Sequence, residues 1–290
     1  MSQPHVIATL TSFNRRVKTL ACLQRLAEAA THANIRLAAV LVDDGSTDGT
    51  AEAVTARFDW VHVVHGDGSL FWTRGMHRAM QEALATDSAD YLLWLNDDTE
   101  LLADSLSRLL VTATEQQTQQ GKPALVVGAT ADAVTGQITY SGQVSAGRWR
   151  RFSFRKVFSA SEALPCDTMN GNVVLLSTAL VRLVGNLDPA FAHAAGDIDY
   201  GLRVRKAGLP MVVTPGVVGY CSNNPTAGGY TDSSAPLRQR WRHMLGRTGL
   251  PVRTWLPLTR KHGGLLWPIY FAWPYLKVVG SSWVAPFKSR

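Results

Sequence analysis

Four runs of mostly apolar residues in the first hundred positions are each followed by a segment long enough for a helix. The runs are HVIATL, LAAVLV, VHVV and YLLWL, and three of the four are almost free of polar residues. Strands of this composition are buried on both faces, which is typical of a parallel sheet covered by helices. We therefore predict an α/β fold with a mostly parallel central sheet and helices on both faces.

Polar residues follow each of these runs. The segments are TSFNRR from Thr11, DDGSTDGT from Asp43, HGDGSLFWTRG from His65 and NDDTEL from Asn96. Parallel strands end at one edge of their sheet, and ligands of such sheets bind beyond the carboxyl ends of the strands. We expect these four segments to converge on a single binding site.

The pattern changes after about residue 121. ALVVGA and NVVLLS read as further strands, the second followed by a helix to about Val184. The segment 136–154 has the alternation and glycines of an antiparallel ribbon. GDIDYGLRVRKAG predicts a helix that begins near Asp197 and stops at Gly208.

The chain is large enough for a substantial core, with 290 residues of which 46% are hydrophobic. Its three cysteines have no metal-like spacing, so we interpret them as reduced thiols of a cytoplasmic protein. The first ten residues lack the features of a secretory signal. The longest apolar stretch, LLWPIYFAWPYL, has 12 residues and two prolines, too few to span a bilayer.

Charge is distributed unevenly along the chain. Residues 201–290 contain 13 Lys and Arg but one acid, Asp232, whereas residues 1–200 are slightly acidic. Five of the nine tryptophans fall in the same basic region. This composition predicts an anionic partner, and nucleic acid, anionic lipid and a diphosphate-bearing substrate are the alternatives.

The acids at the strand ends have both a structural and a functional interpretation. Asn96, Asp97 and Asp98 would either cap the next helix in a solvated loop or bind Mg²⁺ or Mn²⁺, whose preferred ligands are carboxylate oxygens. In DDGSTDGT, Asp48 or Thr50 would cap a helix, whereas Asp43 and Asp44 are placed to contact a base and a ribose.

Two further segments carry the same ambiguity. Asp197 and Asp199 begin a predicted helix, where one would complement the helix dipole and the other act as a general base. Trp72 and Arg74 precede another helix, whose N-terminus suits a diphosphate, although a packed turn explains Trp72 equally well.

The segments TSFN, VDDGSTDGT, LNDD and GDIDYGLRVRKAG, in this order, resemble a family 2 glycosyltransferase with the GT-A fold over about residues 5–215. The C-terminal segment is similar to the tail of bacterial rhamnosyltransferase-like members that build surface polysaccharides, O-antigen and lipopolysaccharide among them. The resemblance implies transfer of a sugar from a nucleotide-diphosphate donor (dTDP-, UDP- or GDP-linked) with inversion.

The resemblance also implies roles for individual residues. Asp197 matches the catalytic base, and Asp98 the metal-binding Asp of the DXD region. Nucleotide binding is expected from Thr11, Phe13, Arg15, Asp43, Asp44, Arg74 and Asp97. Acceptor binding is expected from Trp72, Asn170, Gly171 and Asn172.

Two departures from the family pattern concern the catalytic and metal residues. The Glu that usually precedes the catalytic Asp is Gly196 here. Where many members have a metal-binding His, this chain has Tyr220, so the third metal ligand is open and His193 is a candidate.

We expect a GT-A catalytic domain over residues 1–235, with a nucleotide-binding half (about 1–120) and an acceptor half (about 121–235). Residues 236–290 would form a helical, basic and aromatic extension. The expected acceptor is a saccharide carried on a lipid, reached by a peripheral enzyme on the inner face of the cell membrane. Nucleic acid is not expected, because no recognised binding motif accompanies the charge.

Two other functions remain compatible with parts of the pattern. A sugar nucleotidylyltransferase also binds nucleotides and metals on an α/β sheet, but TSFNRRVK lacks the glycines of its phosphate loop. A non-catalytic protein that binds sugar nucleotides or polysaccharides would not need both Asp98 and Asp197.

Overall fold

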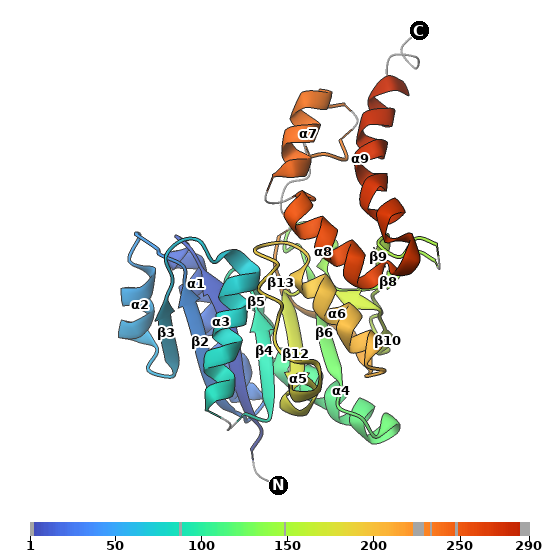
Figure 1. Cartoon of the computed structure of the whole chain (residues 1–290). Helices are drawn as coiled ribbons and strands as arrows, with labels where there is room; N and C mark the ends of the chain where they lie inside the picture. The colour runs from blue at the N-terminus through green and yellow to red at the C-terminus, as the bar shows by residue number, and fades with distance from the viewer. Residues whose placement is uncertain are drawn as a thin grey trace.

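The computed structural model describes residues 3–86, 89–147, 149–222, 229–232, 234–246 and 249–284. The predicted parallel strands lie together in one sheet (Figure 1). They pair in the order β3-β2-β1-β4, with bounds β1 (His5–Ser12), β2 (Arg36–Asp43), β3 (Val61–His65) and β4 (Tyr91–Leu95).

The sheet continues through strands of both directions. β12 (Val173–Ser177) lies antiparallel between β4 and β6 (Leu125–Ala131), and β13 (Met211–Tyr220) runs parallel to β6. The short strands are β5 (Glu100–Leu101), β7 (Ile138–Tyr140) and β10 (Leu164–Pro165). The predicted ribbon is confirmed in part. β8 (Gly142–Ser145) pairs antiparallel with β9 (Phe154–Lys156) and with β11 (Thr168–Met169) in a small sheet, whereas β7 pairs with β6 of the main sheet.

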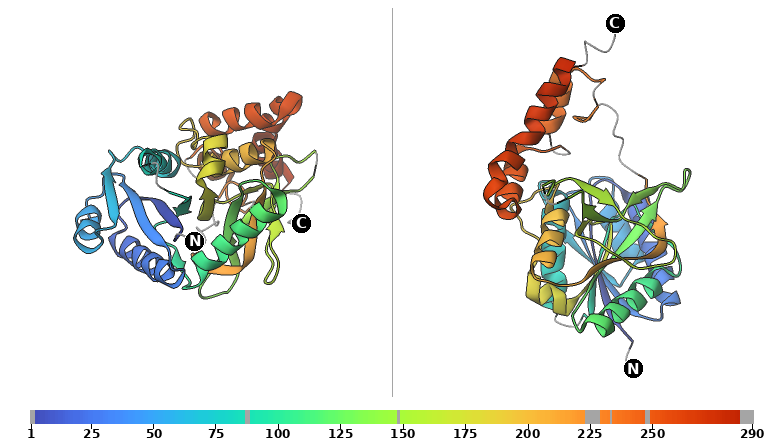
Figure 2. Two further views of the ribbon diagram at one scale, coloured as in Figure 1. Left: turned by 90° about the horizontal axis from the view of Figure 1, so that it is seen from below. Right: turned by 90° about the vertical axis from the view of Figure 1, so that its right-hand side faces the viewer.

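Three helices cover each face of the main sheet, as Figure 2 shows from below. One layer consists of α1 (Arg16–His32), α2 (Thr50–Arg57) and α4 (Ser105–Gln120). The other consists of α3 (Phe71–Ala85), α5 (Thr178–Val184) and α6 (Gly196–Lys206). The mostly parallel sheet with helices on both faces confirms the predicted fold class.

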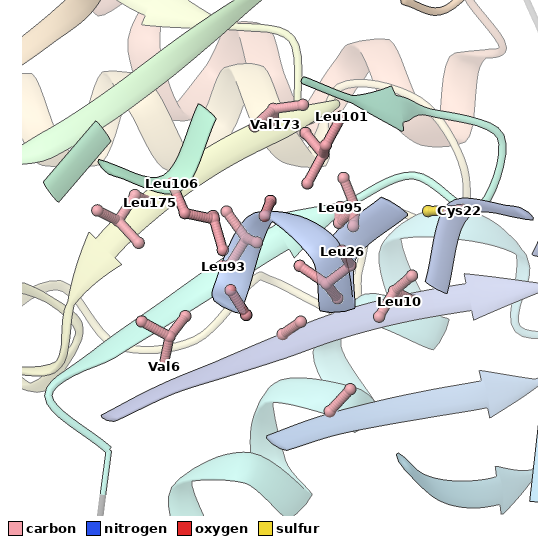
Figure 3. Packing of buried hydrophobic residues seen from close by; sticks show 14 of the residues in the cluster. Val6, Leu10, Cys22, Leu26, Leu93, Leu95, Leu101, Leu106, Val173 and Leu175 are labelled. Atoms are coloured by element: carbon pink, nitrogen blue, oxygen red, sulfur yellow. The ribbon is translucent and has the colours of Figure 1, made fainter. Parts of the chain in front are cut away.

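The core beneath α1 shows how burial selects a helix face. Leu26 and Cys22 point from α1 toward Leu10 and Leu93 of the sheet (Figure 3). Val17, at the start of α1, is one helical period from Leu20, but it is 81% exposed. Helical spacing alone therefore does not identify which face of α1 is buried.

The C-terminal extension is helical. Its elements are α7 (Leu237–Leu245), α8 (Val252–His262), a 3-10 turn (Gly264–Leu266) and α9 (Trp267–Val284). In Figure 1, α8 lies next to α6, while α7 and α9 rise away from the sheet. Within the described residues, no helix combines the length and apolarity required to cross a membrane.

The tryptophans of the extension differ in their environments. Trp255 of α8 is buried beside Phe191 and Leu258, and its Nε1 donates a hydrogen bond to the Phe271 carbonyl at 3.1 Å. Trp273 of α9 is instead 62% exposed. The side chain of Trp283 lies outside the described residues. The basic aromatic region thus contributes both to packing and to the surface.

A fully buried carboxylate joins the C-terminal extension to the α/β fold. Asp199 of α6 accepts hydrogen bonds from Arg203 Nε (2.9 Å) and from Lys261 Nζ and His262 Nε2 of α8 (2.8 Å each to Oδ1). Burial alone would raise the pKa of Asp199, but the hydrogen bonds from His262 and Lys261 and the charge of Arg203 lower it overall. Asp199 therefore anchors α8 to α6. This is a structural role, as expected for one of the two acids at the start of α6.

We predict that Asp199→Asn lowers the free energy of unfolding by about 3 kcal/mol, because it leaves partly buried cations without their counter-charge. Glu28→Gln, which removes an exposed carboxylate paired with Arg25, should change it by less than about 1 kcal/mol. Urea unfolding at neutral pH measures both. Since the folded-state pKa of Asp199 lies below the ordinary value, wild type should lose this stabilisation only below about pH 4. If the two substitutions lowered the free energy of unfolding equally, Asp199 would not be an anchor for α8.

Candidate active site

The carboxyl ends of β1 and β4 meet through a shared cation. Arg15, at the start of α1, places Nη1 3.0 Å from Asp97 Oδ1 and 2.9 Å from Asp98 Oδ2. Two adjacent carboxylates repel each other, and this guanidinium compensates both. The expectation that these strand ends converge is confirmed.

The two acids have different surroundings. Asp97 is 4% exposed and lies 3.4 Å from Thr19 Oγ1, and burial raises its pKa more than Arg15 lowers it. Asp98 is half-buried, and its Oδ1 lies 3.5 Å from Cys221 Sγ. Burial and the charge of Asp98 raise the pKa of Cys221 to about 11, so this thiol is neutral beside the carboxylate at neutral pH.

The acids after β2 are buried and bound to backbone. Asp43 Oδ1 accepts a hydrogen bond from the Ser46 N–H at 3.1 Å. The Asp44 carboxylate accepts three, from the N–H groups of Gly68 (3.0 Å), Leu70 (3.2 Å) and Phe71 (2.9 Å). Asp44 thereby holds the loop between β3 and α3 rather than presenting a free carboxylate.

The remaining residues expected at the nucleotide lie at the end of β1 and in the first turn of α3. Thr11 contacts Gly75 of α3 so closely that a Cβ at position 75 would come within 2.4 Å of Thr11 Oγ1. Phe13 is 53% exposed after β1. Arg74 Nε donates to the Pro189 carbonyl at 3.0 Å, which ties the start of α3 to the segment before α6.

A continuous series of contacts connects the acid pair to Asp197. Trp72 Nε1 donates to Asn96 Oδ1 at 2.8 Å, beside Asp97. The Trp72 ring packs against Gly171, where a Cβ would come within 2.3 Å of the ring. The Gly171 N–H in turn donates to Asp197 Oδ2 at 3.0 Å. The structure brings the expected base and the expected acid pair together around Trp72.

Asp197 lies in the first turn of α6 and is half-buried. Burial raises its pKa above the ordinary value, although the N–H groups of Gly171 and Ile198 lower it in part. A carboxylate of raised pKa is a better proton acceptor. The preceding Ala195 has a φ of 69°, an uncommon conformation for a residue with a Cβ.

The close approach of two helices explains why position 196 holds glycine. A Cβ there would come within 2.3 Å of the Thr73 side chain of α3. The Thr73 N–H and hydroxyl also donate to the carbonyls of Ala192 and His193, at 3.1 and 3.2 Å. The family's Glu does not fit at this position.

The two asparagines beside Gly171 make internal contacts. Asn170 Oδ1 accepts from Gln143 Nε2 at 2.9 Å. Asn172 is 1% exposed, accepts from Thr99 Oγ1 at 2.9 Å and donates to Cys221 Sγ at 3.4 Å. This burial argues against direct contact between Asn172 and an acceptor and indicates a supporting role for the loop that carries Asp98.

None of the residues considered for the third metal ligand completes a three-residue cluster. The His193 ring contacts Phe71, and Tyr220 pairs with Glu100 in β5, with its side chain 40% exposed. Among the described residues, no group of three or more His, Cys, Asp or Glu is placed to hold a metal. Sequence reasoning missed Cys221 beside Asp98, because β13, the strand that ends just before Cys221, was not predicted.

These contacts place an acid pair and a helix-start Asp at the carboxyl edge of an α/β sheet. A family model described as Glycosyl transferase family 2 matches residues 9–160. A second, described as Glycosyl transferase family group 2, matches residues 91–287. The chain belongs to glycosyl transferase family 2 and is a glycosyltransferase. No curated protein matches the sequence.

Several solved structures share the fold at low sequence identity. The mannosyltransferase PcManGT from Pyrobaculum calidifontis, in complex with GDP-Man and Mn²⁺, is 15% identical with a TM-score of 0.57, over 100% of this chain and 77% of that one. S. aureus TarS 1–349 is 13% identical with a TM-score of 0.54, over 88% of this chain and 69% of that one. GalNAc-T7 with UDP, GalNAc and Mn²⁺ is 12% identical with a TM-score of 0.54, over 77% of this chain and 45% of that one. These likenesses show the GT-A fold.

Proposed function

We propose that the chain transfers a sugar from a nucleotide-diphosphate donor to a saccharide acceptor with inversion, in one displacement. The observation that carries the proposal is the series of contacts through Asn96, Trp72 and Gly171 that links the Asp97–Asp98 pair to Asp197. A base and a diphosphate site in one region would allow the acceptor oxygen to attack the sugar opposite the leaving group. Asp197 accepts the acceptor hydroxyl proton as the new bond forms.

The residues at the end of β4 fit a divalent metal. Mg²⁺ and Mn²⁺ are commonly held by one or two carboxylates, with water and substrate phosphates as the other ligands, so a larger protein cluster is not required. Asp98, assisted by Asp97, would hold the ion. When bound, the metal would neutralise charge on the departing diphosphate. The PcManGT and GalNAc-T7 structures, which contain Mn²⁺, support a divalent metal in this chain.

We assign the nucleotide to the ends of β1 and β2. Thr11 and Phe13 would line the nucleoside pocket, and Asp43 would contact the base or ribose. Asp44 would support the same pocket indirectly, by holding the loop between β3 and α3 in place through hydrogen bonds to its backbone. Arg15 and Arg74 would meet the diphosphate. The UDP bound to GalNAc-T7 and the GDP-Man bound to PcManGT support a donor of this class, with a dTDP-linked sugar as a third candidate.

We further propose a lipid-linked acceptor, reached at the inner face of a bacterial membrane during surface polysaccharide synthesis. The basic composition of the extension supports this, as do the side chains that α9 exposes. Ile269, Trp273 and Leu276 are 59%, 62% and 63% exposed. Exposed aromatic and aliphatic side chains among basic residues suit the headgroup layer of an anionic bilayer.

We predict that Asp98→Ala abolishes metal-dependent nucleotide binding. Losing even a partner of a metal ligand typically costs 10–100-fold in affinity, so the loss should exceed about tenfold. Calorimetric titration with UDP, GDP and dTDP, in Mn²⁺ and in EDTA, measures it. Glu100→Ala, an exposed acid two residues further on, is the matched control. Metal-dependent affinity that survives in Asp98→Ala would refute the assignment.

We predict that Asp197→Asn lowers turnover by about 10²–10⁴-fold, because the amide keeps the Gly171 hydrogen bond but cannot take a proton. Nucleotide affinity should remain near that of wild type. The wild-type kcat/KM should decline as the pH falls through the raised pKa of Asp197, above the value of about 4 for an ordinary Asp. Asp104→Asn, a distant exposed acid, should have no effect. Near-normal turnover of Asp197→Asn would remove it from the mechanism.

We predict that the full chain co-sediments with vesicles that contain phosphatidylglycerol. The bound fraction of protein should rise with the proportion of anionic lipid and fall at high salt, because salt screens the charges. Arg253→Ala in α8 should weaken binding about fivefold, since a basic residue at an anionic surface contributes about 1 kcal/mol. Arg25→Ala in α1 is the control. If the protein ignores anionic vesicles at low salt, the extension does not bind membrane.

A further inference from the structure

A cavity lies between the catalytic fold and the C-terminal helices. Its volume is about 1000 Å³, at the upper end of the range for ligand pockets. Ile198 of α6, the turn before β9, and α7 to α9 contribute to its walls. The cavity is therefore built jointly by the family fold and the extension, and neither part alone would form it.

The walls of the cavity are largely hydrocarbon. They include Phe152, Trp255, Leu258, Ile269 and Trp273. Trp255 and Leu258 are buried, whereas Ile269 and Trp273 are 59% and 62% exposed. The apolar surface thus continues from the interior out to the exposed face of α9, as a path for a hydrocarbon chain requires.

The charges that line the cavity are of one sign. Arg150, Arg240 and Lys277 contribute, while no Asp or Glu is among its described lining residues. Arg240 is 3% exposed, and its Nε donates to the Tyr230 carbonyl at 3.1 Å. Arg150 and Lys277 are exposed at the surface. Apolar walls with three cations are complementary to an amphiphile with an anionic head.

The cavity is adjacent to the proposed base. Ile198 lines it, and the Ile198 N–H donates to Asp197 Oδ1 at 2.8 Å. Asp199, one residue further, is bound by Lys261 and His262 of α8. The helix that carries Asp197 therefore also forms part of the cavity wall.

We propose that this cavity binds the hydrocarbon chain of the lipid-linked acceptor, with the lipid phosphate at Arg150 and Lys277. The proposal rests on the proposed transfer to a lipid-linked saccharide and names the site of its lipid. A bulk membrane lipid would need only the exposed face of α9, without the buried walls and Arg240.

Monododecyl phosphate, titrated calorimetrically below its micelle concentration into the full-length protein, tests the site. Wild type should bind it at least tenfold more tightly than dodecyl maltoside and show no heat with inorganic phosphate. Ile269→Asp, which puts a charge into the cavity wall, should weaken binding at least tenfold. Leu276→Asp, equally exposed on α9 but outside the cavity, should change it less than twofold. Lys277→Glu should weaken binding, and Arg253→Glu should not.

Equal losses in Ile269→Asp and Leu276→Asp, or no binding by wild type, would overturn the cavity assignment. Both α9 positions are on the surface, so each variant is expected to fold, and circular dichroism checks that it does. Donor hydrolysis by the same samples needs no acceptor, so it tests the transferase proposal separately. Active protein that fails to bind the phosphate amphiphile would refute the lipid site alone.

Discussion

Carboxylates at the edge of an apolar sheet require compensation, and in this chain the compensation holds the site together. Each acid is neutralised or hydrogen-bonded by a different part of the chain: the pair after β4 by a guanidinium from α1, the acid after β2 by the loop before α3. Asp197 and Asp199 are held by the loop before β12 and by α8. Elements distant in sequence are thus fixed around one edge by their charges.

Most of the fold could be predicted because its strands are buried on both faces. The strands from β1 to β4 and their helices follow from apolar runs, and the stop of α6 follows from Gly208, whose φ is 67°. β13 could not be found in the same way, because Pro215 and Gly216 interrupt its apolar pattern. Nor could spacing alone choose the buried face of α1, since Val17 fits the same period as the residues that are buried.

The candidate site was predictable in its residue types and less so in its contacts. Acids at strand ends and at a helix start predicted a site at the carboxyl edge of the sheet, which is where the structure places Asp97, Asp98 and Asp44. Pairwise contacts such as Arg15 with both Asp97 and Asp98 depend on the three-dimensional path of α1 and have no sequence signal. The same holds for Gly171, whose absence of a side chain matters only because Trp72 lies against it.

The anchoring of α8 on Asp199 bears on how such enzymes diversify. Since the carboxylate that holds the extension is two residues from the proposed base, the extension is not an interchangeable module attached by a linker. A chimera that exchanged residues 236–290 for a foreign tail would also need a cation to replace Lys261 and a ring to replace His262. Changes to the extension are thereby constrained at α8, whereas substitutions on the outer face of α9 leave the anchor intact.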